Sequence, residues 1–137
     1  MQTGDKGKIA ESLVLSELVK RGFKVSIPFG DYRYDLIIEK NGEFRRVQIK
    51  YVGNATKYST IPIVLHSITR KGRVQYAPGE LDFIIAYYEP KQSFYVIPWK
   101  DVEGKTAINL RLKKAGNNQQ AGIIPAIKYE NKWDLLL

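Results

Sequence analysis

The pattern of apolar and polar positions predicts one helix followed by strands. Apolar residues recur at helical spacing over residues 4–21, with Val14, Leu15 and Leu18 on one face. Gly22 then follows a basic last turn, which is a common way for a helix to end. Short apolar runs between turn-forming residues predict strands after it. We expect these strands at residues 23–29, 34–39, 43–51, 61–68, 82–88, 94–98 and 108–112.

One helix followed mainly by strands predicts an α+β fold. The expected core is a mixed β-sheet, with the N-terminal helix packed on it and a β-hairpin at its centre. A chain of 137 residues is long enough for one core, so we expect a single domain over residues 1–137. Residues 69–75 and 116–122 are polar and are predicted loops. The tail at residues 129–137 is expected to pair with the sheet or with a partner.

The central hairpin is predicted by Asn41-Gly42, which is the strongest short signal for a two-residue turn. Such a turn pairs Lys40 with Glu43. If the pairing continues along both strands, Asp35 lies directly across from Gln48. Facing residues of antiparallel strands have Cβ atoms about 4.5–5.5 Å apart.

Side chains alternate between the two faces of a strand, so the hairpin brings together three polar groups. Asp35, Gln48 and Lys50 fall on one face, which places a carboxylate, a carboxamide and an ammonium close together. Two such oxygens can hold Mg²⁺, and the ammonium can position a water molecule. The alternative is an exposed polar patch with a weak Asp35–Lys50 ion pair. The other face is predicted to carry Tyr34, Leu36, Ile38, Val47, Ile49 and Tyr51.

Glu11 lies on the same predicted helix face as Val14, Leu15 and Leu18. A carboxylate beside an apolar stripe that packs on a sheet is costly without a partner. A metal ion or a lysine would supply that partner. The alternative is that Glu11 lies at the edge of the stripe and reaches solvent.

The amino-acid composition and the net charge limit the classes of function that the chain can have. The chain has no cysteine and one histidine, which excludes disulfide scaffolds and thiolate or histidine-rich metal sites. No apolar run is long enough to span a membrane and no signal peptide is visible, so we expect a cytoplasmic protein. The formal net charge of +8 favours a polyanionic partner such as nucleic acid.

The motifs resemble those of the PD-(D/E)xK phosphodiesterase superfamily. The resemblance rests on a helix with Glu11, then Tyr34-Asp35, then Gln48-Ile49-Lys50 after a hairpin. Within the superfamily, the chain is similar to the small homing endonucleases of cyanobacterial group I introns. The Gly-Asp-Lys opening, the Pro-Phe-Gly-Asp segment and the Gln-x-Lys motif carry that likeness. It covers residues 3–50 closely and the remainder loosely.

The resemblance implies a role for each of these residues. Asp35 would be the main ligand of Mg²⁺, with Mn²⁺ as a substitute. Gln48 would bind through its amide oxygen, aided by the backbone carbonyl of Ile49. Lys50 would orient the attacking water, and Glu11 would be an outer ligand. The chain departs from the superfamily at position 34, where Pro is common, and at Gln48, where most members have Asp or Glu. The neutral ligand should weaken metal binding.

Two basic clusters are candidate DNA contacts. Basic side chains can bind phosphates, and Arg can also read guanine in the major groove. The alternative is that these are solvated loops. The expected partner is double-stranded DNA, and two-strand cleavage favours a homodimer or homotetramer. The candidate residues are Arg70, Lys71 and Arg73 in one cluster and Arg111, Lys113 and Lys114 in the other.

The sequence therefore predicts a Mg²⁺-dependent endonuclease that hydrolyses phosphodiester bonds in double-stranded DNA, of the sequence-specific homing type. Two alternatives stay open: a Holliday-junction resolvase and a catalytically inactive DNA-binding protein on the same fold. A basic RNA-binding domain is a further alternative, although no exposed base-stacking motif is identified for it.

Overall fold

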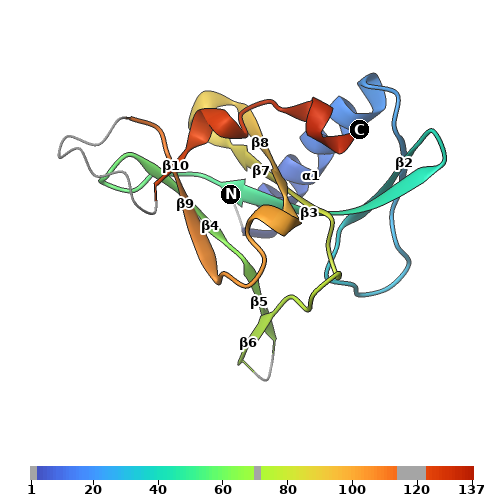
Figure 1. The fold of residues 1–137 in the computed structure, drawn as a ribbon, viewed down its shortest axis with the longest axis horizontal. Helices are drawn as coiled ribbons and strands as arrows, with labels where there is room; N and C mark the ends of the chain where they lie inside the picture. Colours follow the sequence, from blue (N-terminus) through green and yellow to red (C-terminus); the bar gives the residue numbers. More distant parts are fainter. Residues whose placement is uncertain (1–2, 70–71, 114–122) are drawn as a thin grey trace.

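Figure 1 shows the chain in a computed structural model, which describes residues 3–69, 72–113 and 123–137. The fold is α+β, as predicted: one long N-terminal helix packs against mixed β-sheets. No helix in the described ranges is long and apolar enough to cross a membrane. The helix is α1 (Thr3–Lys20), and the strands are β1 (Lys24–Ser26), β2 (Leu36–Lys40), β3 (Glu43–Val52), β4 (Thr60–Val64), β5 (His66–Thr69), β6 (Gly72–Gln75), β7 (Phe83–Tyr88), β8 (Ser93–Pro98), β9 (Ala107–Arg111) and β10 (Ile124–Pro125).

The central sheet has the strand order β1-β2-β3-β7-β8. Its pairs are antiparallel except β3 and β7, which run parallel. A parallel pair requires a long crossover, and here the chain between β3 and β7 forms β4, β5 and β6 on the way. Strand β3 therefore lies between the hairpin partner β2 and the buried strand β7, at the middle of the sheet.

Both faces of this sheet are covered. One face packs against α1 through a core that includes Val14, Leu18, Val47 and Ile85. The opposite face packs against the small sheet β10-β9-β4 in a second core. Strands buried on both faces carry apolar residues at nearly every position, which explains the continuous apolar runs of β7 and β8.

The boundaries of two predicted strands, residues 23–29 and 61–68, differ from those in the structure. The predicted strand over residues 23–29 ends at Ser26, and Ile27 and Phe29 lie exposed in the following loop. The predicted strand over residues 61–68 is divided, because β4 pairs with β9 whereas β5 belongs to another sheet. The sequence pattern marks extended segments there but does not show where the chain changes partner.

The predicted polar loop over residues 69–75 is also wrong. Strands β5 and β6 pair as an antiparallel hairpin that projects from the body of the molecule (Figure 1). Apolar alternation does not mark this hairpin, because its residues are mainly polar and basic. The second predicted loop, residues 116–122, lies outside the described residues.

The C-terminal segment covers the outer edge of β8. The N–H of Val96 donates to the carbonyl of Tyr129 at 3.0 Å, and the N–H of Asn131 donates to the carbonyl of Phe94 at 2.7 Å. Trp133 then packs between Phe94 and the guanidinium of Arg21 at the end of α1. The expectation that the tail pairs with the sheet is confirmed, and the sheet edge is protected from pairing with other chains.

Candidate active site

The hairpin that carries the candidate site turns at Asn41 and Gly42. Both residues have positive φ values, 55° and 79°, as the common two-residue hairpin turn requires. The observed register pairs Lys40 with Glu43 and continues to Leu36 with Val47. The predicted register of β2 and β3 is therefore confirmed over the whole length of β2.

The register changes at Asp35, where the prediction is wrong by one step. The N–H of Asp35 donates to the carbonyl of Val47 at 2.8 Å, although Leu36 already faces Val47. Two successive residues opposite one residue form a β-bulge, which bends a strand and redirects its side chains. Tyr34 accordingly packs with the core on the side of β4 and β9, and not with Leu36 as predicted.

The bulge turns the Asp35 carboxylate toward the edge of β3. Oδ2 of Asp35 accepts a hydrogen bond from the N–H of Ile49 at 2.8 Å. Because the N–H and C=O of one strand residue point to the same edge, the Ile49 carbonyl projects to the Asp35 side as well. Burial raises the pKa of the Asp35 carboxyl and Glu11 adds to the rise, against the lowering effects of the Ile49 N–H and Lys50.

Lys50 lies close enough to Asp35 for each charge to affect the other. Burial lowers the pKa of the Lys50 ammonium, while Asp35 acts to raise it. The Lys50 Nζ also lies 6.0 Å from the centre of the Tyr76 ring, within the range of a cation–π contact. The predicted association of Asp35 with Lys50 is thus present in a partly buried setting, where charges interact more strongly than at an open surface.

Gln48 carries the most informative atom of the site. Its amide oxygen Oε1 is buried and has no hydrogen-bond partner among the described residues. A buried oxygen without a partner costs roughly 1–3 kcal/mol, so such atoms call for an explanation. Gln48 belongs to the same strand as Lys50 and directly precedes Ile49, whose N–H holds Asp35.

Glu11 does not lie in the buried stripe of α1. That stripe consists of Ala10, Val14 and Leu18, whereas Glu11 is exposed beside it. Of the two alternatives for Glu11, the structure shows the second: Glu11 lies at the edge of the stripe and reaches solvent, so it carries no cost of burial. Its carboxylate nevertheless faces the site closely enough to raise the pKa of Asp35.

The residues present fit a hard divalent cation such as Mg²⁺, which prefers oxygen ligands. The set comprises the Asp35 carboxylate, the unpartnered amide oxygen of Gln48 and the Ile49 carbonyl, with Glu11 nearby. No group of three or more His, Cys, Asp or Glu side chains suited to a metal occurs among the residues with described positions. A metal here would depend on the amide, the backbone carbonyl and water to complete its shell.

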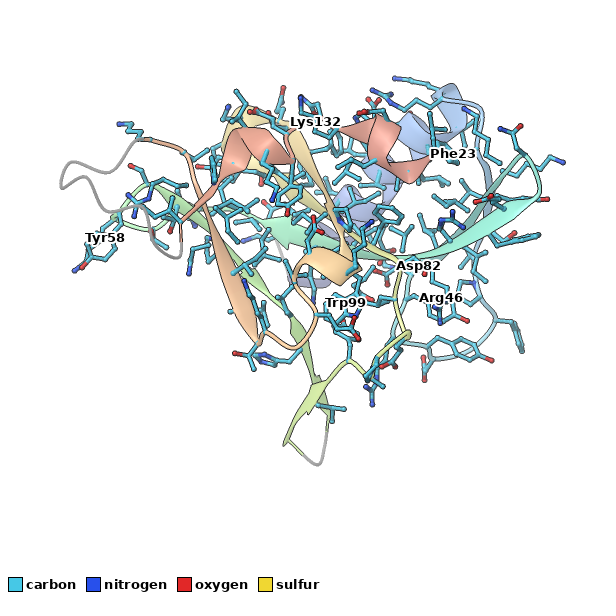
Figure 2. The ribbon with its side chains drawn as sticks, viewed as in Figure 1. Phe23, Arg46, Tyr58, Asp82, Trp99 and Lys132 are labelled. Atoms are coloured by element: carbon cyan, nitrogen blue, oxygen red, sulfur yellow. The ribbon has the colours of Figure 1, made fainter. Side chains whose placement is uncertain are left out.

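An ion pair beside the site was not predicted from the sequence. The Asp82 carboxylate accepts hydrogen bonds from the backbone N–H of Arg46 at 2.7 Å and from its guanidinium at 3.3 Å (Figure 2). The contact ties β3 to the chain entering β7, two residues before Gln48. The sequence feature that could have indicated this ion pair is the acidic residue Asp82, which directly precedes the apolar strand β7. Because Asp82 is engaged with Arg46, it is poorly placed to serve as a metal ligand.

Of the six predicted DNA-contact residues, Arg111 and Lys113 have described side chains. Arg111 ends β9, half-buried, and Lys113 follows it exposed. The base of the β5–β6 hairpin lies at the other end of β9, where the N–H of Leu65 donates to the carbonyl of Thr106 at 2.8 Å. Arg73 lies within β6, while Arg70, Lys71 and Lys114 lie outside the described residues.

Comparison with known proteins points to the same chemistry. A solved structure described as a bacterial homing endonuclease, I-Ssp6803I, is similar over 100% of this chain and 94% of that chain, with 26% identity and a TM-score of 0.81. A comparison with curated proteins gives no significant match. A sequence model of the PD-(D/E)XK endonuclease family matches residues 1–136. The chain therefore belongs to the PD-(D/E)XK endonuclease family, as the motifs around Asp35 and Lys50 predicted.

Proposed function

We propose that this chain is a metal-dependent endonuclease that hydrolyses phosphodiester bonds in double-stranded DNA. The observation that carries the proposal is the buried, unpartnered Oε1 of Gln48, on the same strand as Lys50 and directly before Ile49, whose N–H holds the Asp35 carboxylate. Family membership supports nuclease activity, and the formal net charge of +8 supports a polyanionic substrate.

In the proposed site, Asp35, Gln48 and the Ile49 carbonyl would hold Mg²⁺, and Glu11 would be an outer ligand. Bound Mg²⁺ would polarise the scissile phosphate and favour ionisation of an attacking water. Lys50 contributes an ammonium that donates hydrogen bonds to the water and to the phosphate oxygens as their charge grows. Asp35, fixed by the N–H of Ile49, keeps its carboxylate at a set position relative to Lys50.

We further propose that cleavage is sequence-specific and of the homing type. Support comes from the likeness to I-Ssp6803I, described as a bacterial homing endonuclease, over the full length of this chain. Selection of cleaved molecules from a randomised duplex library tests this point. Enrichment of one extended site is the expected result, and cleavage without any enrichment would contradict it.

A second candidate is a DNA-binding protein without catalysis. The neutral amide of Gln48 favours it, because a second carboxylate would bind Mg²⁺ more strongly. The two candidates differ in one outcome, since only the endonuclease consumes DNA when Mg²⁺ is present.

Plasmid cleavage tests the proposal directly. Wild-type protein is incubated with supercoiled plasmid and Mg²⁺, in parallel with EDTA and with the variants Lys50→Ala and Asp35→Asn. We expect each variant to cut about 10²–10³-fold more slowly and EDTA to stop the reaction. Lys132→Ala is the matched control, because Lys132 is an exposed lysine of the C-terminal segment, which covers the β8 edge of the sheet and not the β2–β3 hairpin that carries the site. Equal cutting by all proteins would exclude this site as the catalyst.

A further inference from the structure

The loop between β1 and β2 exposes three large apolar side chains. Phe29 is 99% exposed, Ile27 72% and Tyr32 59%. Single exposed apolar residues are common, but here three lie within six positions of one loop, and groups of exposed apolar side chains mark sites of interaction. Neither core of the protein includes these side chains.

Packing and ion pairing hold this loop in place. The rings of Tyr32 and Tyr34 stack with centres 5.6 Å apart. Arg33 pairs with Glu80 at 3.2 Å, and the Glu80 carboxylate also accepts the N–H of Ala77 at 2.6 Å. These contacts anchor the end of the loop next to Asp35, and Phe29 lies three residues before Tyr32 with its ring exposed.

The loop leads directly into the candidate active site. Phe29 precedes Asp35 by six residues, a stretch that spans at most about 20 Å. At about 3.4 Å per base pair, that distance corresponds to roughly six base-pair steps. Phe29 therefore lies within about 20 Å of a scissile phosphate held at Asp35, close enough for both residues to contact one duplex.

The size of the patch favours DNA over a second copy of the chain. Three such side chains offer at most about 600 Å² between them. A stable interface between protein chains buries about 800 Å² on each partner. A single exposed apolar ring is, however, sufficient to enter a base-pair step, since architectural proteins insert Phe, Leu or Ile between bases in this way.

We propose that Phe29 is a wedge that enters the bound duplex and unstacks a base-pair step beside the cleavage site, with Tyr32 packed next to it. The inference rests on the proposed function, since the duplex is placed by its scissile phosphate at Asp35. Unstacking would bend the target and would favour sequences whose steps deform easily.

The test uses duplexes that the wild-type protein cleaves, with 2-aminopurine placed at successive positions around the cut. The Lys50→Ala protein binds them uncut, and 2-aminopurine fluorescence rises where a base is unstacked. We expect a rise at one or two adjacent positions within about six steps of the cut. Adding Phe29→Ala should abolish the rise and weaken binding about tenfold. Phe29→Leu, which keeps an apolar wedge, should retain it.

Phe44→Ala is the matched control, because Phe44 is another exposed phenylalanine, 61% exposed, beside the hairpin turn. It should leave the fluorescence unchanged. Unchanged 2-aminopurine fluorescence at every position, or a rise in fluorescence that persists in Phe29→Ala, would refute the proposal that Phe29 acts as a wedge. A change of sedimenting mass on Phe29→Ala would instead assign the patch to a second copy. If wild-type protein cuts no duplex, the proposed function itself fails, whereas cutting without dependence on Phe29 refutes only the wedge.

Discussion

At the scale of single residues, Gln48 sets the metal requirement of the proposed site. A neutral amide supplies an oxygen but no charge, so binding of Mg²⁺ should be weaker than with a carboxylate. Gln48→Glu should therefore lower the Mg²⁺ concentration needed for half-maximal cleavage, by about tenfold for each 1.4 kcal/mol gained. Titrating Mg²⁺ in the plasmid assay measures this. An unchanged or higher requirement would show that position 48 does not contact the metal.

Asp35 should decrease the stability of the metal-free protein at neutral pH. Burial raises the pKa of its carboxyl above the ordinary 3.8, so the folded state disfavours the charged form. The cost is present at pH values above the raised pKa and disappears as the pH falls below 3.8. In EDTA, Asp35→Asn should thus raise Tm at pH 7 and leave it unchanged at acid pH. Thermal unfolding followed by circular dichroism checks both conditions.

Asp82→Asn is the control for that experiment. The Asp82 carboxylate pairs with Arg46, so its removal should lower Tm instead of raising it.

Added Mg²⁺ should stabilise the wild-type protein and not the Asp35→Asn variant, because a ligand stabilises only the state that binds it. A lower Tm for Asp35→Asn in EDTA at pH 7 would contradict the inference that the buried, charged Asp35 carboxylate destabilises the folded protein.

At the scale of elements, the C-terminal segment closes the edge of β8 through Glu130. Hydrogen bonding from Lys91 holds the pKa of the Glu130 carboxyl below the ordinary 4.5, against an opposing effect of burial. The stabilisation is therefore present above 4.5 and is lost as the pH falls through the lowered pKa. Glu130→Gln should reduce the free energy of unfolding by no more than about 1 kcal/mol at pH 7, because the pair is partly exposed. Urea unfolding at pH 7 and at acid pH measures this, and equal losses at both would contradict it.

Some features of the strands and turns could be predicted from the sequence, and others could not. The β2–β3 hairpin could be predicted because Asn41-Gly42 has the backbone freedom that the turn requires. The bulge at Asp35 could not be predicted, because no Gly or Pro occurs at that position to indicate it. The alternation of side chains along a strand assumes that the two strands pair without interruption. The unpartnered Oε1 of Gln48 could not be predicted either, because the burial of one side-chain atom depends on tertiary packing, which the alternation along a strand does not describe. The β5–β6 hairpin was missed because its mostly polar strands lack apolar alternation.

At the scale of the whole molecule, one site per chain cuts one strand, so cleavage of both strands needs two copies. We propose a homodimer or homotetramer on this ground. Wild-type protein should convert supercoiled plasmid directly to linear DNA and should sediment as a dimer or tetramer at assay concentrations. A monomer that releases only nicked circles would contradict the proposed assembly.

The central claim is that the oxygens of Asp35 and Gln48 hold the metal beside Lys50. Its most direct test is anomalous diffraction from crystals of the wild-type protein soaked in Mn²⁺. We expect a peak at coordination distance, about 2.0–2.2 Å, from the Asp35 carboxylate and from Oε1 of Gln48. A peak at other residues, with Oε1 of Gln48 bound to a protein donor or left unpartnered, would contradict it.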